Sequence, residues 1–550
     1  MSYLLFPGRH LVNTVFQERY LKRLLTESPA ALPGFIAGRI ALKNSPTEIV
    51  FAITSANQEN SRFNPIPFHI RAVGVDRFAR HLQMAAPFRY RIFGIPHYGH
   101  TKNFAAFTIK EIACQSEQTI NLSPQNCLVL CSTPEVIRLY QELGFGIVPA
   151  ERGEPQPQPC TPIEIIREIG ERGENWRAGE LAAGQLAPGH LSLFEDFPEV
   201  PIRIARLYQD PLTNQEGSLT ETRNYSSYAR GMNEIVRLKY LDIRNAVKSG
   251  RIVDEGCADG ALLAQISHDF PDSDLFGIDL SAEFAGRFHE RQRTGEFGGA
   301  YVHFFHRNLF DHIFEPDSID TTICNSTLHE IWSYGDGEKS VCNYLAEKFR
   351  QLRPGGRLVI RDVVGPDDGE REVLLWCSDH DGRKLTRTET ENLPDRNSAA
   401  LHGLSSQSRF YFFARDFRKG QYSNDFKEQR QKDRTIFRLT LCLAAEFLSK
   451  KDYVDNWSSE MNEEFCFWTF GEWKRKLKNV GFEIYENPNQ PAGGSRVYTN
   501  PWIVEKRHKG HVELLDLEEK ALPWPPTNMI LVAEKPMEPR PAPSGRERKR

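Results

Sequence analysis

Residues 251–280 of this chain read RIVDEGCADGALLAQISHDFPDSDLFGIDL. The stretch opens as an apolar strand and enters a turn that contains Gly256 and Gly260, and an amphipathic helical pattern follows. A second apolar strand, 275–278, ends on Asp279. This order is typical of a βαβ unit with a nucleotide site. Glycines let backbone N–H groups approach a ligand, and an acid after the next strand can accept hydrogen bonds from ribose hydroxyls.

The composition of the turn favours one class of ligand over another. The turn lacks the GxGxxG pattern, and the acids in E-G-C-A-D-G (255–260) would repel a pyrophosphate. A cationic nucleoside without phosphate, such as S-adenosylmethionine, therefore suits it better.

Five segments, in order, resemble the motifs of class I S-adenosylmethionine-dependent methyltransferases. They are V-D-E-G-C-A-D-G (253–260), L-F-G-I-D-L-S (275–281), H-F-F-H-R-N-L-F-D (303–311), S-I-D-T-T-I-C-N-S-T-L-H-E-I (318–331) and L-R-P-G-G-R-L-V-I-R-D (352–362). The resemblance covers about 230–365, with closing elements near 467–535. One departure is Ala258, where the family usually has glycine.

The resemblance implies a set of residues that bind the cofactor S-adenosyl-L-methionine. Glu255 and the glycine turn would face its methionine part, Asp279 its ribose, and Asn308 with Leu309 its adenine. These residues follow neighbouring strands, whose carboxyl ends meet in one crevice. The full implied set is Asp254, Glu255, Gly256, Cys257, Ala258, Gly260, Asp279, Leu280, Asn308, Leu309 and Asn325.

The sulfonium of such a donor is already activated, so the protein must supply placement and, for some acceptors, a base. His329 and Glu330 come just past the fourth strand and are the candidate catalytic residues. In the alternative interpretation, His329 only caps or lines the helix. Ten cysteines occur singly and without a CxxC pair, which indicates reduced thiols and no metal site.

Residues 1–180 also alternate strands and helices, which predicts a second doubly wound α/β domain. The expected strands are 3–6, 48–54, 90–95, 127–131 and 146–148, and the expected helices include 17–25, 68–82 and 134–143. Gly8 and Arg9 after the first strand, I-T-S-A-N-Q-E-N-S-R-F-N-P-I-P-F-H-I-R (53–71) and C-T-P-I-E-I-I-R-E-I (160–169) resemble nicotinamide-nucleotide adenylyltransferases.

That second resemblance implies a nucleotide site, with a nucleoside triphosphate and Mg as its ligands. Its residues here would be Gly8, Arg9, His10, Thr161 and Arg167. The family places an H-x-G-H pair after its first strand, whereas this chain has only His10 there. Phosphoryl transfer depends on positioned charge, so we expect a degenerate nucleotidylyltransferase-like domain that binds a nucleotide.

The sequence thus predicts an α/β protein with two doubly wound sheets, the second a seven-stranded methyltransferase sheet with a large insertion. We expect a nucleotidylyltransferase-like domain over 1–180, a helical connector over 181–230, a methyltransferase domain over 231–536 and a disordered tail over 537–550. The insertion, 366–465, would contain a helix over 435–448 and act as a lid, a dimerisation element or a structural cover. A closing hairpin is expected near 496–535.

The whole chain has 550 residues, 40% hydrophobic content and a formal charge of -4, values typical of a globular protein without a global nucleic-acid footprint. No apolar run is long enough for a membrane span, and no signal peptide is recognised, so we expect a cytoplasmic location. The leading function is methyl transfer to O or N of a small-molecule or nucleotide-like acceptor. The alternatives are a bifunctional nucleotidylyltransferase/methyltransferase and a non-catalytic sensor or RNA-associated protein.

Overall fold

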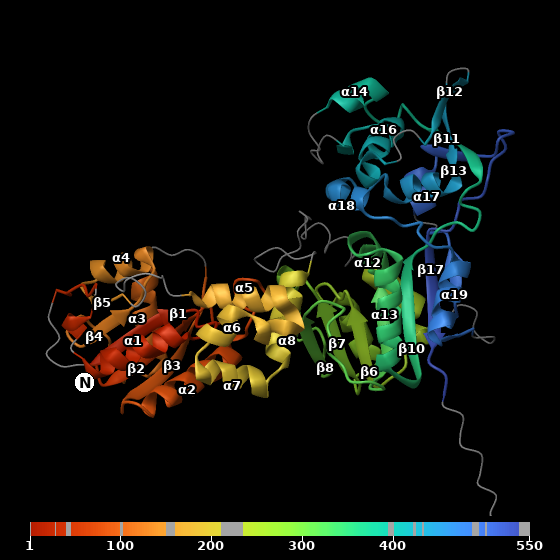
Figure 1. The fold of residues 1–550 in the computed structure, drawn as a ribbon. Helices are drawn as coiled ribbons and strands as arrows, with labels where there is room; N and C mark the ends of the chain where they lie inside the picture. The colour runs from red at the N-terminus through yellow and green to blue at the C-terminus, as the bar shows by residue number, and fades with distance from the viewer. Residues whose placement is uncertain are drawn as a thin grey trace, which may run out of the picture. The chain divides into compact units, whose positions relative to one another are not determined.

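The computed structural model describes residues 2–27, 29–32, 34–39, 46–98, 103–149, 160–210, 235–393, 401–421, 425–431, 434–486, 494–500 and 503–537. The chain divides into two compact units, Met1–Ser218 and Leu219–Arg550 (Figure 1). Most of the predicted tail, and the part of the predicted connector from 211 onward, lie outside the described residues.

The N-terminal unit is built on a five-stranded parallel sheet with the order β3-β2-β1-β4-β5. All five predicted strands are confirmed: β1 (Tyr3–Gly8), β2 (Glu48–Thr54), β3 (Arg89–Ile95), β4 (Cys127–Leu130) and β5 (Gly146–Val148). Both faces carry an apolar core, because alternate residues of β1 and β2 point to opposite sides. The helices of these two layers are α1 (Val15–Thr26), α2 (Phe68–Gln83), α3 (Phe104–Gln115) and α4 (Pro134–Glu142).

A group of helices completes the N-terminal unit. These are α5 (Pro162–Arg172), α6 (Glu180–Gln185), α7 (Pro188–Asp196) and α8 (Glu199–Gln209). They share a core of their own around Ile165, Trp176 and Phe194. The Arg62 guanidinium, in the loop after β2, donates to the carbonyls of Leu207 and Asp210. The first part of the predicted connector is therefore a packed part of this unit.

The main sheet of the C-terminal unit has the order β14-β17-β10-β9-β6-β7-β8. Its strands are β6 (Arg251–Glu255), β7 (Asp274–Asp279), β8 (Tyr301–His306), β9 (Ile319–Asn325), β10 (Leu352–Val363), β14 (Glu483–Ile484) and β17 (Asn528–Glu534). The strands from β6 to β10 run parallel, and β17 pairs with β10 antiparallel, as the sequence predicted for the closing strand. A short strand, β15 (Arg496–Tyr498), also pairs with β17.

Helices cover both faces of this sheet. One face carries α10 (Ala261–Asp269), α11 (Ala282–Arg293) and a helix over 235–243. The other carries α12 (Leu328–Tyr334), α13 (Glu338–Gln351) and α19 (Phe470–Val480). The carboxyl ends of β6, β7, β9 and β10 therefore meet at one edge, between two helical layers.

The insertion forms a second sheet, which the sequence did not predict. Its order is β12-β13-β11-β16, all antiparallel, with β11 (Glu372–Cys377), β12 (Lys427–Gln431), β13 (Arg434–Thr440) and β16 (Val512–Leu515). The helix expected over 435–448 is wrong in its first half, where β13 stands, and α17 begins only at Leu441. The hairpin expected near 496–535 is also corrected, because its middle pairs with β11 of the insertion.

An aromatic core holds the insertion together. Phe410 on α16 (Ser406–Asp416) stacks on Phe437 of β13, with ring centroids 4.0 Å apart. Phe447 of α17 meets Phe410 edge to face. Such pairs add about 0.5–1.5 kcal/mol each beyond their burial. The insertion is thus a packed α/β layer with helices α14 (Arg387–Asn392), α16, α17 (Leu441–Lys450) and α18 (Trp457–Asn462).

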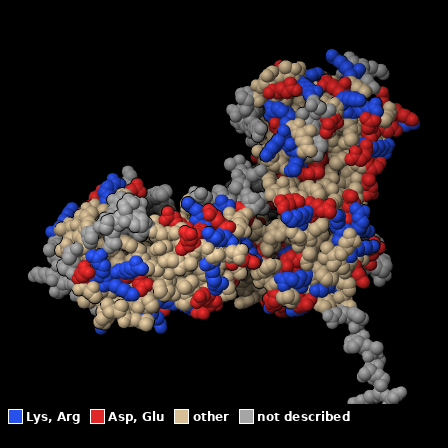
Figure 2. All heavy atoms as spheres, viewed as in Figure 1, with Lys and Arg blue, Asp and Glu red and all other residues tan. Residues whose placement is uncertain are grey.

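Three whole-chain expectations can be compared with the described residues. All ten cysteines are free thiols, and five are buried. Among the described helices, none has the length and apolar character needed to cross a membrane. Basic and acidic side chains intermingle over the face that Figure 2 shows, without a broad area of one sign.

Candidate functional site

The turn between β6 and α10 adopts three left-handed backbone conformations. Gly256, Ala258 and Gly260 have φ values of 71°, 48° and 80°. Glycine reaches this region without cost, whereas an L-residue with a side chain pays roughly 1–2 kcal/mol. Ala258 therefore keeps the conformation that glycine would have, at an energetic cost that a glycine would avoid.

Two of these positions also exclude a side chain by packing. A Cβ at Gly256 would lie 2.3 Å from Oγ1 of Thr327, and one at Gly260 would lie 2.5 Å from Cδ2 of Phe288. Thr327 follows β9, so the close approach brings the turn against the end of the next strand. Packing against Thr327 and Phe288 thus fixes the backbone of the turn, and its N–H groups keep a defined direction.

Asp279 ties the end of β7 to the same turn. Its Oδ2 accepts from the Ala258 N–H at 2.9 Å, and its Oδ1 accepts from the Ser281 N–H at 2.8 Å. A carboxylate offers about four acceptor sites, and two of its hydrogen bonds tie Asp279 to the backbone of the turn and of the residue that follows it. Asp279 is half-buried, which suits a residue that both shapes a site and meets a ligand.

The neighbouring acids Asp254 and Glu255 lie on opposite faces of β6. Glu255 is buried and accepts from the Tyr344 hydroxyl and from Lys348 Nζ, the latter at 2.5 Å, both on α13. Its predicted role toward the methionine part of a donor does not fit this position. Asp254 turns to the other face, toward the helix over 235–243.

The Asp254 carboxyl is almost fully buried, at 2% exposure. Burial, and after it the nearby charges of Asp279 and Glu255, together raise its pKa to about 7, against the opposing charge of Lys239. Lys239 is the counterpart that the sequence did not single out. It lies in an ordinary helical pattern, R-L-K-Y-L, and its packing was not apparent there.

The remaining residues that we predict to bind the cofactor differ in whether their side chain or their backbone takes part in hydrogen bonds and packing. Asn308 begins a turn in which its Oδ1 accepts from the Phe310 N–H at 3.1 Å, and Leu309 packs partly against the core. The Leu280 carbonyl interacts with Nε2 of His306 at 2.9 Å. The Cys257 thiol packs into the sheet, because a Cβ at Gly277 would lie 2.7 Å from its Sγ, so only the backbone of Cys257 lines the turn.

Asn325 ends β9 and is buried at 6% exposure. Its Oδ1 lies 3.4 Å from Oγ of Ser326, which has a left-handed backbone with φ 58°. The edge of the sheet where the parallel strands end therefore brings together Asp254, the turn, Asp279 and Asn325, as the order of the strands requires.

His329, a predicted base, is held between two carboxylates. Its Nδ1 lies 2.7 Å from Oδ1 of Asp362, and its Nε2 lies 3.5 Å from Oε2 of Glu463. Burial opposes the charged imidazole, but both carboxylates raise the pKa of His329 well above its usual value. Both ring nitrogens of His329 thus face carboxylates, an arrangement that suits the alternative interpretation, in which His329 lines the helix, and its catalytic role stays a prediction.

Asp362 and Glu463 connect this histidine to two different layers. Asp362, near the end of β10, also accepts from the N–H groups of Thr327 and Leu328, and so caps α12. Glu463 belongs to the insertion. Beside it, the Trp332 indole N–H donates to Glu464 at 3.2 Å. We call His329 with Asp362 and Glu463 the His329 clamp. These buried contacts hold the insertion against α12.

Glu330, the second predicted catalytic residue, lies in the first turn of α12 and is half-buried. It stays a candidate on position alone.

A comparison with protein-family models gives one match. Residues 246–427 match the model of a methyltransferase domain. This part of the chain is similar to a methyltransferase domain. The matched range holds β6 to β10, the turn, Asp279 and more than half of the insertion. A search of curated proteins finds no match to this chain.

Solved structures give weaker likenesses to methyltransferases. A putative O-methyltransferase from Nostoc punctiforme shares 12% identity at a TM-score of 0.30, over 56% of this chain and 58% of that one. A methyltransferase from Mesorhizobium loti shares 16% at 0.28, over 55% and 98%. Geranyl diphosphate C-methyltransferase from Streptomyces coelicolor, solved with Mg²⁺, geranyl diphosphate and S-adenosyl-L-homocysteine, shares 11% at 0.28, over 60% and 89%. At these scores the likenesses carry no argument.

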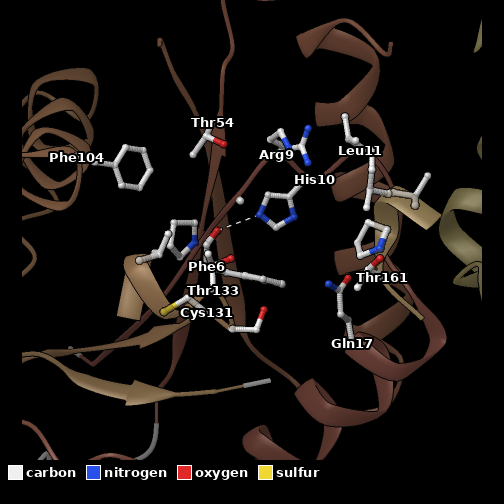
Figure 3. A pocket seen from close by; sticks show the side chains of 17 residues that line it. Phe6, Arg9, His10, Leu11, Gln17, Thr54, Phe104, Cys131, Thr133 and Thr161 are labelled. Atoms are coloured by element: carbon white, nitrogen blue, oxygen red, sulfur yellow. Dashed lines mark hydrogen bonds between the residues drawn. The ribbon is translucent and has the colours of Figure 1, made fainter. Parts of the chain in front are cut away.

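The N-terminal unit, outside the matched range, contains a pocket of about 360 Å³ at the carboxyl ends of β1 and β4 (Figure 3). Four of the five residues predicted to bind a nucleotide line it: Gly8, Arg9, His10 and Thr161. Arg167 does not line it and is exposed on α5. Thr133 and Thr161, which precede α4 and α5, line it too, so two helix N-termini face the pocket.

His10 is fixed in this pocket as a neutral ring. Its Nε2 interacts with the Phe6 carbonyl at 3.0 Å, the dashed contact in Figure 3, and its ring meets Phe6 and Phe51 edge to face. Burial, with a smaller contribution from the charge of Arg71, lowers the pKa of His10 to about 4, although the contact with the Phe6 carbonyl opposes the shift. His10 therefore offers no positive charge at neutral pH.

Proposed function

We propose that this chain is an S-adenosylmethionine-dependent methyltransferase that acts on O or N of a small-molecule or nucleotide-like acceptor. The observation that carries the proposal is the turn of Gly256, Ala258 and Gly260, tied to Asp279, at the crevice edge of a matched methyltransferase domain. A bare backbone turn followed by an acid suits a nucleoside ligand.

The residues present fit a cationic donor. Asp279 lies at the turn, where its negative charge attracts a sulfonium and repels a pyrophosphate. Bound S-adenosylmethionine would supply a methyl group on a sulfonium, already activated toward a nucleophile. The turn N–H groups would orient it, Asp279 would accept hydrogen bonds from the ribose hydroxyls, and Asn308 with Leu309 would border the adenine.

The acceptor side of the proposal involves α12 and the insertion. The His329 clamp places the insertion beside α12, at the same edge as the turn. An acceptor held there would be oriented by the insertion and kept from bulk water. Because the methyl donor is already activated, this placement is the main contribution that the protein must make. Glu330 stays the candidate base for an acceptor that must lose a proton.

For the N-terminal unit we propose nucleotide binding without nucleotidyl transfer. Arg9, two helix N-termini and a pocket of about 360 Å³ suit an anionic ligand. A neutral His10 stabilises no transferring phosphate, so the bifunctional alternative lacks the charge that it needs.

Methyl transfer itself tests the first proposal. The full chain is incubated with methyl-labelled S-adenosylmethionine and a fractionated cell extract, and label is sought in small molecules, nucleotides and RNA. We expect label in a small-molecule or nucleotide fraction, which is lost with Asp279→Ala. Donor binding without any labelled product would favour the sensor alternative, and label in RNA would redirect the acceptor class.

A further inference from the structure

The insertion contains a pocket of its own, apart from the crevice of the methyltransferase sheet. Its volume is about 410 Å³. The pocket lies where α16, the turn Phe417–Gly420 and α18 meet, and both helices are labelled in Figure 1. Pockets that bind small molecules measure about 300–1,000 Å³, so this one has room for a ligand.

The charges that line the pocket do not balance. Of its described lining residues only Asp416 is acidic, and both of its carboxylate oxygens accept from the Arg415 guanidinium, at 2.7 and 3.1 Å. Its Oδ2 also accepts from the indole N–H of Trp457 at 2.9 Å. Lys419 lines the same pocket, is exposed, and makes no ion pair within the part of the chain that the structure describes. One positive charge is therefore left over at the pocket.

The backbone that carries Lys419 is held in a costly conformation. Arg418 and Lys419 have left-handed φ values of 48° and 59°. This conformation costs roughly 1–2 kcal/mol for each residue with a side chain. The Arg418 guanidinium donates to the Asn462 carbonyl at the end of α18, at 2.7 Å, and so ties the turn to that helix. Backbone strain of this kind is typical of segments that hold a ligand.

The pocket also presents apolar side chains from α18. Trp457 and Met461 line it and are buried at 3% and 2% exposure. An ammonium group beside apolar side chains complements a molecule that carries a carboxylate on an apolar body.

One helix separates this pocket from α12. Ser458 and Met461 of α18 line the pocket. On α12, the Tyr334 hydroxyl lies 3.2 Å from Oγ of Ser459 and 3.3 Å from Oε1 of Glu463. The helical repeat places these two pairs on opposite sides of α18. The pocket is thus a second site, and α18 connects it to the His329 clamp through Glu463.

We propose that this pocket binds a small organic acid, with the carboxylate at Lys419 and the apolar part against Trp457 and Met461. Arg415 stays engaged with Asp416 and shapes the wall of the pocket. Because α18 lies between the pocket and α12, binding of the acid requires neither methyl donor nor acceptor. A ligand that binds only the folded chain also raises its thermal stability.

A matched pair of probes tests this on the full chain. 3-Phenylpropanoate has a carboxylate on an apolar body, and 3-phenylpropanamide has the same body without the charge. Ligand-observed NMR titration should give a dissociation constant on the order of 1 mM for the acid. Lys419→Met should weaken the acid at least about fivefold and leave the amide within about twofold. Lys427→Met, an exposed lysine of β12 in the same insertion, should change neither probe.

Three results would overturn the proposal. They are no binding of 3-phenylpropanoate to the wild-type chain at millimolar concentration, an unchanged affinity in Lys419→Met, and equal weakening by Lys427→Met. A second variant, Ser458→Asp, adds a negative charge at an exposed position of the pocket and should weaken the acid alone. Thermal unfolding of each variant separates loss of folding from loss of contact. All of these outcomes leave the methyltransferase proposal untouched, since no methyl donor is present.

Discussion

Nδ1 of His329 lies 2.7 Å from Oδ1 of Asp362, and both side chains are buried. This one pair connects the first turn of α12 to the end of β10, and Glu463 extends it to the insertion. The histidine that the sequence offers as a base thus contacts carboxylates from two different layers of the fold. Because His329 lies near the carboxyl ends of the central strands, its removal should affect both the stability of the fold and the region proposed to hold the methyl acceptor.

The clamp predicts a large loss of stability for His329→Ala. The change leaves Asp362 and Glu463 buried without their common cation, which costs about 3–5 kcal/mol for a buried ion pair. Urea unfolding followed by tryptophan fluorescence measures it, since Trp332 lies beside the clamp. His312→Ala, which removes an exposed partner of Glu347, should cost less than about 1 kcal/mol. Similar costs for both variants would contradict the clamp.

The raised pKa of Asp254, about 7, predicts a pH-dependent effect of Asp254→Asn. An unfolded aspartate titrates near pH 4, so the folded chain binds more protons between about pH 4 and 7. This carboxyl therefore contributes less stability as the pH rises through that window. Relative to wild type, Asp254→Asn should gain on the order of 2 kcal/mol from about pH 5 to about pH 8.

Urea unfolding at the two pH values measures this gain. Asp274→Asn, at the exposed start of β7, is the matched control and should show a flat difference from wild type. A flat difference for Asp254→Asn as well would mean that its carboxyl has an ordinary pKa.

The turn predicts opposite effects for two glycine substitutions. Gly256→Ala forces a Cβ to within 2.3 Å of Thr327 Oγ1 at a left-handed φ, so we expect a loss of at least about 2 kcal/mol and of donor binding. Gly286→Ala, on the open face of α11, meets nothing within 4 Å and should stabilise by about 0.5–1 kcal/mol. Thermal unfolding distinguishes them, and an equal response to both would refute the tight turn.

Ala258 predicts a stabilising change at the same turn. Its left-handed φ of 48° carries a cost that Ala258→Gly removes, so we expect a gain of roughly 1 kcal/mol. The hydrogen bond from its N–H to Asp279 involves only the backbone and should persist. A destabilised Ala258→Gly variant would show that the methyl group packs usefully. Urea unfolding of the two chains decides it.

The strands and helices with strong local patterns were predictable from the sequence, including β1 to β5 and the turn at Gly256. The errors arose where partners are distant in the chain. The strand β13 was mistaken for the start of a helix, because an apolar run of its length fits either form until its neighbours β11 and β12 are known. Pairing of β16 with β11 is equally non-local.

At the site, the position of the glycine turn was predictable from the sequence. Strand alternation also indicates that Asp254 and Glu255 face opposite sides of the sheet, whereas the partners of Glu255 on α13 depend on the fold. The role of His329 could not be predicted, since Asp362 and Glu463 reach it only through the fold. Lys239 gave no local indication, because its burial depends on how its helix lies against the sheet.

Binding of S-adenosyl-L-methionine to the full chain, measured by titration calorimetry, tests the central claim most directly. We expect saturable binding at one site, weakened at least about tenfold by Asp279→Ala and left unchanged by Asp274→Ala at the exposed start of the same strand. Absence of binding to the wild-type chain, or an unchanged affinity in Asp279→Ala, would contradict the account.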